Sequence, residues 1–165
     1  MHIVVDRRPA GVALIDDPGG ETLVPESGFA AAVAEREAEH PRWVWTDTAQ
    51  WYPPLLAAGV RVERCHDLRL VDAILAGIDG RPPRRDWGRA PAAARADTLF
   101  ELDGAVDAVP AIAAPLDWQQ QRDAIAAHAD PARLSLLAAA ESAGALTAAE
   151  MHHAGLPWSA AAHDA

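Results

Sequence analysis

The stretch RWVWTDTAQWYPPLLAAGVRVERCHDLRL, residues 42–70, decides the fold class of this chain. Residues 42–45 form a β-prone run, and a polar pair that suits a helix N-cap follows it. A short helix is then expected to end at Gly59, and a second strand is expected at 60–62. Residues 67–76 carry apolar side chains at helical spacing. The order strand, helix, strand, helix predicts an α/β layer.

Two prolines bear on the first of these helices. Its apolar residues Trp51, Leu55 and Leu56 recur at helical spacing. Pro53 and Pro54 lack the backbone N–H that a helix interior uses. We therefore expect them in the first turn of the helix or at a break in it.

The residues before this stretch predict an N-terminal meander. Three short runs rich in β-branched residues, 2–5, 11–15 and 22–24, are separated by turn sequences. Ser27 is placed to cap a helix over 28–39. The order of elements predicts an α/β protein with a mixed sheet.

After residue 76 the apolar periodicity stops, and Pro, Arg, Ala and Gly dominate. Such a composition is typical of a linker. A first helix is expected over 116–129. A second begins at Asp130-Pro131, because Asp favours the N-cap and Pro is tolerated in the first turn. It either continues through Gly144 or breaks there. The predicted organisation is an α/β domain over 1–76, a linker over 77–115 and C-terminal helices over 116–165.

The composition bounds the class of protein. The chain of 165 residues has a net charge of −10, and its 14 basic residues are all arginine. The resulting field opposes DNA binding by the chain as a whole. A single cysteine, Cys65, excludes an internal disulfide and fits a reducing cytoplasm. We see no signal peptide and no membrane-spanning run, so we expect a cytoplasmic protein without a membrane partner.

A second phrase, ESAGALTAAEMHHAGLPW at residues 141–158, predicts a helix that closes at Ala154-Gly155 before Pro157. Together with residues 42–70 it resembles family A DNA polymerases, in particular the actinobacterial bifunctional 3'-5' exonuclease/DNA polymerases. The resemblance implies a ribonuclease H-like, 3'-5' exonuclease-type fold. It also implies DNA as the partner of the parent polymerase and Mg²⁺ as the cofactor of the parent family.

The same resemblance implies that residues 116–165 lead into a polymerase domain that lies outside this stretch. The apolar stripe of Leu137, Leu146 and Met151 would then lack its partners. We expect weak attachment and fast amide exchange from about residue 143 onward.

In that family, carboxylates hold two metal ions: an Asp-x-Glu pair on the first strand, an Asp at a later helix start, and a Tyr-x-x-x-Asp on a late helix. The N-terminal strands here contain no Asp-x-Glu. Asp47 lies about one turn before the family's aspartate position, near Trp51. It is a weak candidate for a metal ligand, and a helix cap is its favoured role.

On the late helix, Trp118 and Arg122 stand where Tyr and Asp are required. The comparison with the family motifs therefore implies no catalytic residue and no metal site in this stretch. It implies no cofactor of its own and no exonuclease activity.

Two further segments of the chain suggest binding partners. Arg81, Arg84 and Arg85 form a basic cluster and are candidate nucleic-acid contacts, with a solvated linker as the alternative. Leu99 and Phe100 are similar to the apolar end of the peptide that binds the bacterial sliding clamp. The alternative for this pair is a small anchor that packs on the domain.

Two short motifs are interpreted as structural. Cys65-His66-Asp67 has no nearby paired ligands for a metal and no marked base for a nucleophile, so a cap or core role is expected. His152 and His153 point about 100° apart on a helix and are expected to be solvated at its end.

These observations favour the degenerate, exonuclease-like N-terminal part of a family A DNA-directed DNA polymerase that acts in DNA replication or repair. Two alternatives stay open. One is a stand-alone, non-catalytic interaction domain. The other is an intact two-metal 3'-5' exonuclease whose ligands are aligned differently.

Overall fold

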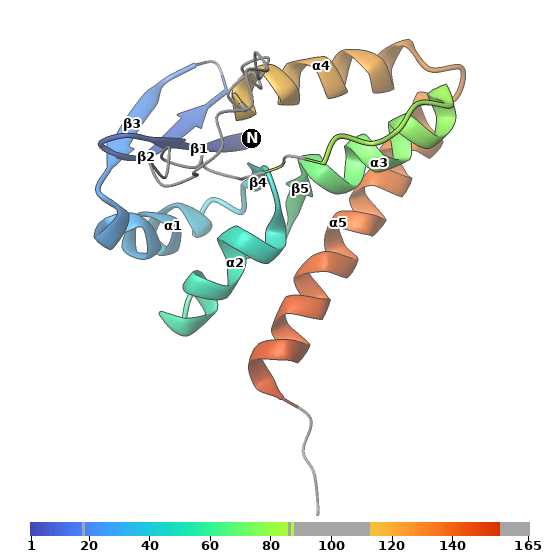
Figure 1. Ribbon diagram of the computed structural model, residues 1–165. Helices are drawn as coiled ribbons and strands as arrows, with labels where there is room; N and C mark the ends of the chain where they lie inside the picture. The colour runs from blue at the N-terminus through green and yellow to red at the C-terminus, as the bar shows by residue number, and fades with distance from the viewer. Residues whose placement is uncertain (18, 86, 88–112, 156–165) are drawn as a thin grey trace, which may run out of the picture.

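The computed structural model describes residues 1–17, 19–85, 87 and 113–155. One five-stranded sheet has the order β3-β2-β1-β4-β5 (Figure 1). The strands are β1 (His2–Arg8), β2 (Gly11–Asp16), β3 (Glu21–Val24), β4 (Arg42–Trp45) and β5 (Cys65–Asp67). The first three strands pair antiparallel, whereas β1, β4 and β5 run parallel. The predicted α/β class with a mixed sheet is confirmed.

Helices cover both faces of this sheet (Figure 1). They are the 3-10 turn η1 (Glu26–Gly28) and the helices α1 (Phe29–Glu37), α2 (Thr48–Ala57), α3 (Leu68–Asp79), α4 (Ala114–Ala127) and α5 (Pro131–Ala154). α1 and α2 pack on one face together with part of α5, and the start of α4 packs on the other. The first part of α5 packs against α3.

The alternation of side chains along β4 divides the core in two. Trp43 and Trp45 are fully buried on the face that α1 and α2 cover. Val44 points to the opposite face, because successive strand residues do so, and it belongs there to a second core cluster with Trp87 and Ala114. The strand at residues 42–45 therefore contributes side chains to the core on each face of the sheet.

The second parallel strand differs from the prediction. Residues 60–62 are not a strand; β5 begins at Cys65, which is in register with Trp43. Gly59 has a positive φ of 76°, and the Val60 N–H turns back to the Leu55 carbonyl at 2.8 Å. Val62 is buried in the larger core, and its N–H donates to the Tyr52 hydroxyl rather than to a neighbouring strand. Val60 and Val62 thus pack on the larger core without pairing in a strand, although their β-branched side chains are typical of strands.

Two local predictions about helix starts and prolines are wrong. Ser27 lies in η1, and Gly28 takes the N-cap position of α1 without a side-chain bond. Pro53 and Pro54 lie inside α2 rather than in its first turn. Both prolines are exposed. Ala49 and Gln50, whose carbonyls would accept from the missing N–H groups, are also exposed, so water can reach them.

α5 continues through Gly144 as one helix. Leu146 is 5% exposed and belongs to the larger core, so the expectation that it lacks a partner is wrong. α2 supplies that partner: the Tyr52 hydroxyl donates to Glu150 Oε1 at 2.6 Å. Leu137 and Met151 are exposed, as expected for residues without a packing partner.

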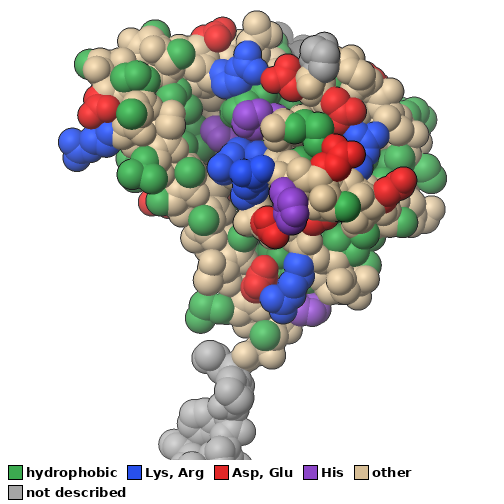
Figure 2. All heavy atoms as spheres, turned by 180° about the vertical axis from the view of Figure 1, so that it is seen from behind, with side chains coloured by type: hydrophobic (Ala, Val, Ile, Leu, Met, Phe, Trp, Pro, Cys, Tyr) green, Lys and Arg blue, Asp and Glu red, His purple; other side chains and the backbone are tan. Residues whose placement is uncertain are grey.

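α3 ends at Asp79 rather than at residue 76, because Gly80 closes it in the left-handed conformation, with φ 67°. The chain then stays against this helix, since the Arg84 N–H donates to Asp72 Oδ2 at 2.8 Å. No helix within the described residues has the length and apolar character that crossing a membrane requires. On the face that Figure 2 shows, arginine and histidine side chains gather near the middle.

Candidate functional site

The parallel strands end together at one edge of the sheet, which is where α/β proteins commonly bind ligands. Asp6 lies near the end of β1, Asp47 follows β4 and Asp67 ends β5. All three carboxylates are largely buried. What each one contacts determines what this edge can bind.

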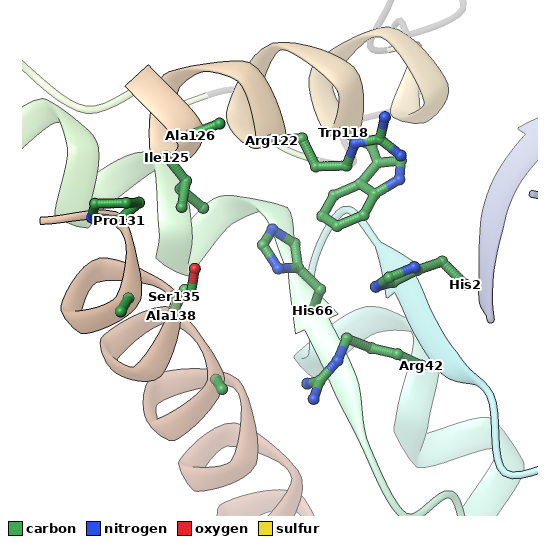
Figure 3. Close-up of a pocket in the computed structure, with 12 residues that line it drawn as sticks. His2, Arg42, His66, Trp118, Arg122, Ile125, Ala126, Pro131, Ser135 and Ala138 are labelled. Carbon is green, nitrogen blue, oxygen red and sulfur yellow. The ribbon is translucent and has the colours of Figure 1, made fainter. Parts of the chain in front are cut away.

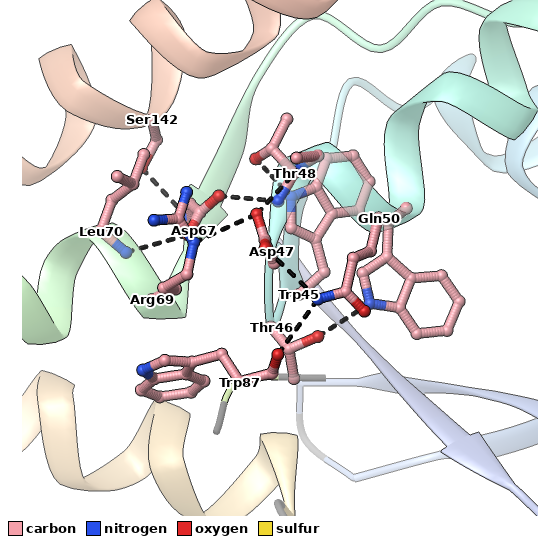
Figure 4. Close-up of polar contacts among 12 residues, drawn as sticks. Trp45, Thr46, Asp47, Thr48, Gln50, Asp67, Arg69, Leu70, Trp87 and Ser142 are labelled. Carbon is pink, nitrogen blue, oxygen red and sulfur yellow. Dashed lines mark hydrogen bonds and ion pairs between the residues drawn. The ribbon is translucent and has the colours of Figure 1, made fainter. Parts of the chain in front are cut away.

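Asp47, the weak candidate for a metal ligand, is the N-cap of α2 (Figure 4). Its Oδ1 accepts from the Ala49 N–H at 3.1 Å, and its Oδ2 accepts from Gln50 Nε2 at 3.3 Å. Arg69 Nε lies 3.2 Å from Oδ1, at an angle that gives an ion pair but no hydrogen bond. The predicted cap role is confirmed, and a guanidinium already neutralises this carboxylate.

Asp67 caps α3 and also holds α2 (Figure 4). Its Oδ1 accepts from the Leu70 N–H at 2.9 Å, and its Oδ2 accepts from the Thr48 N–H at 2.7 Å. Its own N–H donates to Ser142 Oγ on α5 at 3.1 Å. Burial raises the pKa of this carboxyl, although the two backbone donors favour its ionised form. The cap role predicted from Cys65-His66-Asp67 is confirmed.

Asp6 has a different partner. Its Oδ2 lies 3.1 Å from Arg8 Nη2. Burial raises the pKa of Asp6, and the charge of Arg8 opposes that change. The described ranges contain no group of three or more His, Cys, Asp or Glu residues placed to hold a metal ion. The edge is thus built from three carboxylates that are each engaged by their own donors or cations.

The residues at the positions of the family's Tyr-x-x-x-Asp lie at the other end of the sheet. Trp118 packs on His2, with ring centroids 4.9 Å apart, and His2 begins β1. Arg122 Nη1 is 3.6 Å from Asp17, just after β2. Because Asp47 follows the carboxyl end of β4, neither Trp118 nor Arg122 shares a site with it.

The arginines proposed as nucleic-acid contacts are exposed, and two of them form ion pairs. Arg81 Nη2 is 2.7 Å from Asp72. Arg84 Nη1 is 3.0 Å from each oxygen of Asp117, and its guanidinium stacks over Trp87. These carboxylates weaken the attraction of this segment for phosphate. Leu99 and Phe100 lie outside the described residues.

The remaining motif residues have structural environments. Cys65 is buried, and burial raises its thiol pKa to about 12, so it is protonated at neutral pH. His152 and His153 lie exposed in the last turn of α5, as predicted.

Three residues that complete these networks carry no local sequence signal for their role. Arg69 neutralises Asp47, Ser142 accepts from the Asp67 N–H, and Gln121 bonds both His66 and the Leu68 carbonyl. Ser142 and Gln121 are remote in sequence from the residues they contact. Gln121 stands in a run of three glutamines, and nothing local distinguishes the one that points into the core.

Comparison with known proteins gives no relative. No protein-family model, no curated protein and no solved structure matches this chain.

Proposed function

We propose that this chain is a non-catalytic, exonuclease-like α/β domain of a family A DNA-directed DNA polymerase that acts in DNA replication or repair. In this proposal the sheet has a ribonuclease H-like arrangement. DNA, and a sliding clamp if one binds, are partners of the parent polymerase. Mg²⁺ serves the parent polymerase rather than this domain.

The architecture supports the proposal. A meander precedes two parallel strands, with helices on both faces and two more helices after the sheet. A mixed α/β sheet followed by C-terminal helices is the architecture that the resemblance implies. Many α/β proteins share these features, so the fold alone does not assign a function.

The observation that carries the non-catalytic part is the ion pair between Asp47 and Arg69. A two-metal nuclease places divalent cations against carboxylates at such an edge. Here a guanidinium lies against Asp47, while Asp67 binds the N-termini of two helices. These residues do not fit a two-metal centre.

A nuclease assay tests this part directly. The purified chain is incubated with 5'-labelled single-stranded DNA and Mg²⁺ or Mn²⁺. We expect no shortening of the strand, with wild type and Asp47→Ala indistinguishable. Metal-dependent 3'-5' degradation that Asp47→Ala abolishes would instead establish the intact exonuclease. The polymerase assignment is tested by reading the coding sequence downstream of codon 165 for a polymerase domain.

A stand-alone interaction domain is the second candidate, and a groove on α5 favours it. A depression of about 880 Å³ lies between α5 and the starts of α2 and α3. Small residues such as Ala145 and Ala148 line it, and Arg69 and Glu141 flank it. Leu136, which is also on α5, is 70% exposed. An apolar depression with polar groups beside it is typical of a surface that binds another protein.

The two candidates differ in what the gene encodes. A polymerase domain downstream supports the first, whereas a stop codon soon after residue 165 supports the second. Size-exclusion chromatography with light scattering then shows whether the isolated chain self-associates through this groove. Ala145→Glu, which places a charge in the groove, is the variant to compare with wild type.

A further inference from the structure

A second pocket, of about 490 Å³, lies where β1 and β4 begin, under α4 and α5 (Figure 3). Its polar wall is formed by side chains from four elements: His2, Arg42, His66, Trp118 and Arg122. The other wall consists mostly of small apolar residues, with Ile125, Pro131 and several alanines, and Ser135 among them. The pocket is at the opposite end of the parallel strands from Asp47, so it is separate from the edge described above.

The pocket is positive within an acidic protein. Arg42 is half-buried, and its Nη1 donates to the Cys65 carbonyl at 3.0 Å. Among the ion pairs of the described residues, none involves Arg42. Arg122 is 3.6 Å from Asp17, and both side chains are about half exposed, so this contact is weak and the guanidinium can reorient. Two arginines with unused donors thus line the pocket, in a chain whose net charge is −10.

An aromatic surface joins the two arginines (Figure 3). The Trp118 ring packs edge-on against His66, with centroids 4.7 Å apart, and tilted against His2. Arg122 lies over the same indole, 5.6 Å from its centroid. Gln121 holds His66 through a 2.9 Å hydrogen bond to Nε2. The surface is fixed by these contacts before any ligand arrives.

The pKa values of the two histidines in the pocket are both lowered. Burial, with a smaller contribution from the Arg42 charge, lowers the pKa of His66 to about 4. Burial lowers the pKa of His2, and Arg42 and Arg122 add to that effect. Both imidazoles are therefore neutral at physiological pH, and the positive charge of the pocket rests on the arginines.

We propose that this pocket binds a small organic oxyanion, in which a phosphate monoester or carboxylate contacts Arg42 and Arg122 and a flat apolar body lies between Trp118 and the alanine-lined wall of α5. Planar guanidinium groups match the geometry of carboxylate and phosphate oxygens. A cavity of this size holds a ligand with an aromatic ring and a head group. The proposal is independent of the proposed function, because it uses none of the residues at the Asp47 edge.

The test is an NMR titration that follows the indole N–H of Trp118, assigned with Trp118→Phe. Phenyl phosphate and benzoate are the probes, and they distinguish the two head groups. We expect saturable shifts of this signal with at least one of them. Inorganic phosphate and phenol each carry half of the ligand and should bind at least about tenfold more weakly.

Three variants complete the design. Arg42→Gln should weaken the better probe by about tenfold, the size of one charge-assisted hydrogen bond. Arg133→Gln is the matched control: it removes the same charge from an exposed position on α5 that does not line the pocket. Ala132→Phe fills the pocket from an exposed position, leaves both arginines in place and should abolish saturable binding.

Three results would overturn the proposal. Chemical shifts that grow linearly with the concentration of every anion indicate charge screening rather than a binding site. An equal loss of probe affinity in Arg42→Gln and Arg133→Gln indicates a general effect of the protein's charge. Unchanged affinity in a folded Ala132→Phe protein places the binding elsewhere.

Discussion

The carboxylate of Asp67 accepts the Thr48 N–H at 2.7 Å, so the residue that caps α3 also holds the first turn of α2. Asp67 is fully buried, and Thr48 is 1% exposed. A single side chain therefore satisfies one unpaired N–H at each of two helix starts and fixes both helices to the end of β5.

Asp67→Ala should lower the free energy of unfolding by about 2–4 kcal/mol, because the buried Thr48 N–H and the partly buried Leu70 N–H lose their acceptor. Urea denaturation monitored by circular dichroism measures this change. Asp130→Ala is the control, since Asp130 caps only α5 and is exposed; we expect a loss of about 1 kcal/mol there. If both variants lose the same free energy of unfolding, the hydrogen bond to Thr48 adds nothing to the stability.

Stability should fall as pH falls from about 6.5 toward 4, because His66 has a pKa of about 4 in the folded protein against 6.5 as its ordinary value. Above pH 6.5 the imidazole is neutral in both states and contributes nothing. Between these values the unfolded chain binds a proton that the folded chain does not, which favours unfolding by up to roughly 3 kcal/mol.

The comparison with His66→Gln isolates this effect, because the shifted pKa values of His2, Asp6 and Asp67 are common to both proteins. The difference in unfolding free energy between the two should shrink or reverse as the pH is lowered. A difference that is constant from pH 7 to 4.5 would show that His66 titrates normally.

Tyr52→Phe should destabilise the protein by about 1–2 kcal/mol, because it removes the hydroxyl that donates to Glu150 Oε1 at 2.6 Å and accepts from the Val62 N–H. Burial and this carboxylate together raise the pKa of Tyr52. Glu150→Gln retains an acceptor for the hydroxyl and should cost less.

Amide exchange in the same proteins reports on α5. We expect the backbone around Leu146 to be protected in wild type, since this side chain lies in the larger core. Protection should decrease selectively in Tyr52→Phe. Unprotected amides in wild type would instead support the weak attachment that the sequence suggested.

Cys65 should resist thiol reagents in the native protein. Its side chain is 1% exposed, and its pKa of about 12 leaves almost no thiolate at pH 8. Labelling with a disulfide reagent should be slow in buffer and fast in denaturing urea. Fast labelling without denaturant would show that α5, whose Ser142 carbonyl lies 3.5 Å from the thiol sulfur, opens readily.

Local signals predicted much of the architecture. Asp47, Asp67 and Asp130 were recognised as helix caps because a cap depends on a side chain and an N–H two or three residues away. The strand at 42–45 was recognised because alternating large side chains match the two faces of a sheet. The α/β class followed from the order of these elements.

Predictions that depended on a distant partner failed or were missing. Val60 and Val62 have strand-like side chains, but the pairing of β5 with β4 begins only at Cys65. The sequence predicts no partner for Leu146, whereas this side chain lies in the larger core beside residues of α2. Both errors concern what lies opposite a residue, which its neighbours in sequence do not specify.

The sequence by itself determined where β4, α2, α3 and α5 begin, because side-chain alternation and helix caps act over a few residues. Only the tertiary structure decided that Arg69 neutralises Asp47, and that His2, Arg42 and Trp118 line one pocket. His2 and Trp118 are more than a hundred positions apart, and they meet only because β1 and α4 pack together. Such contacts result from the burial of whole elements, which is a property of the assembled core and not of any segment alone.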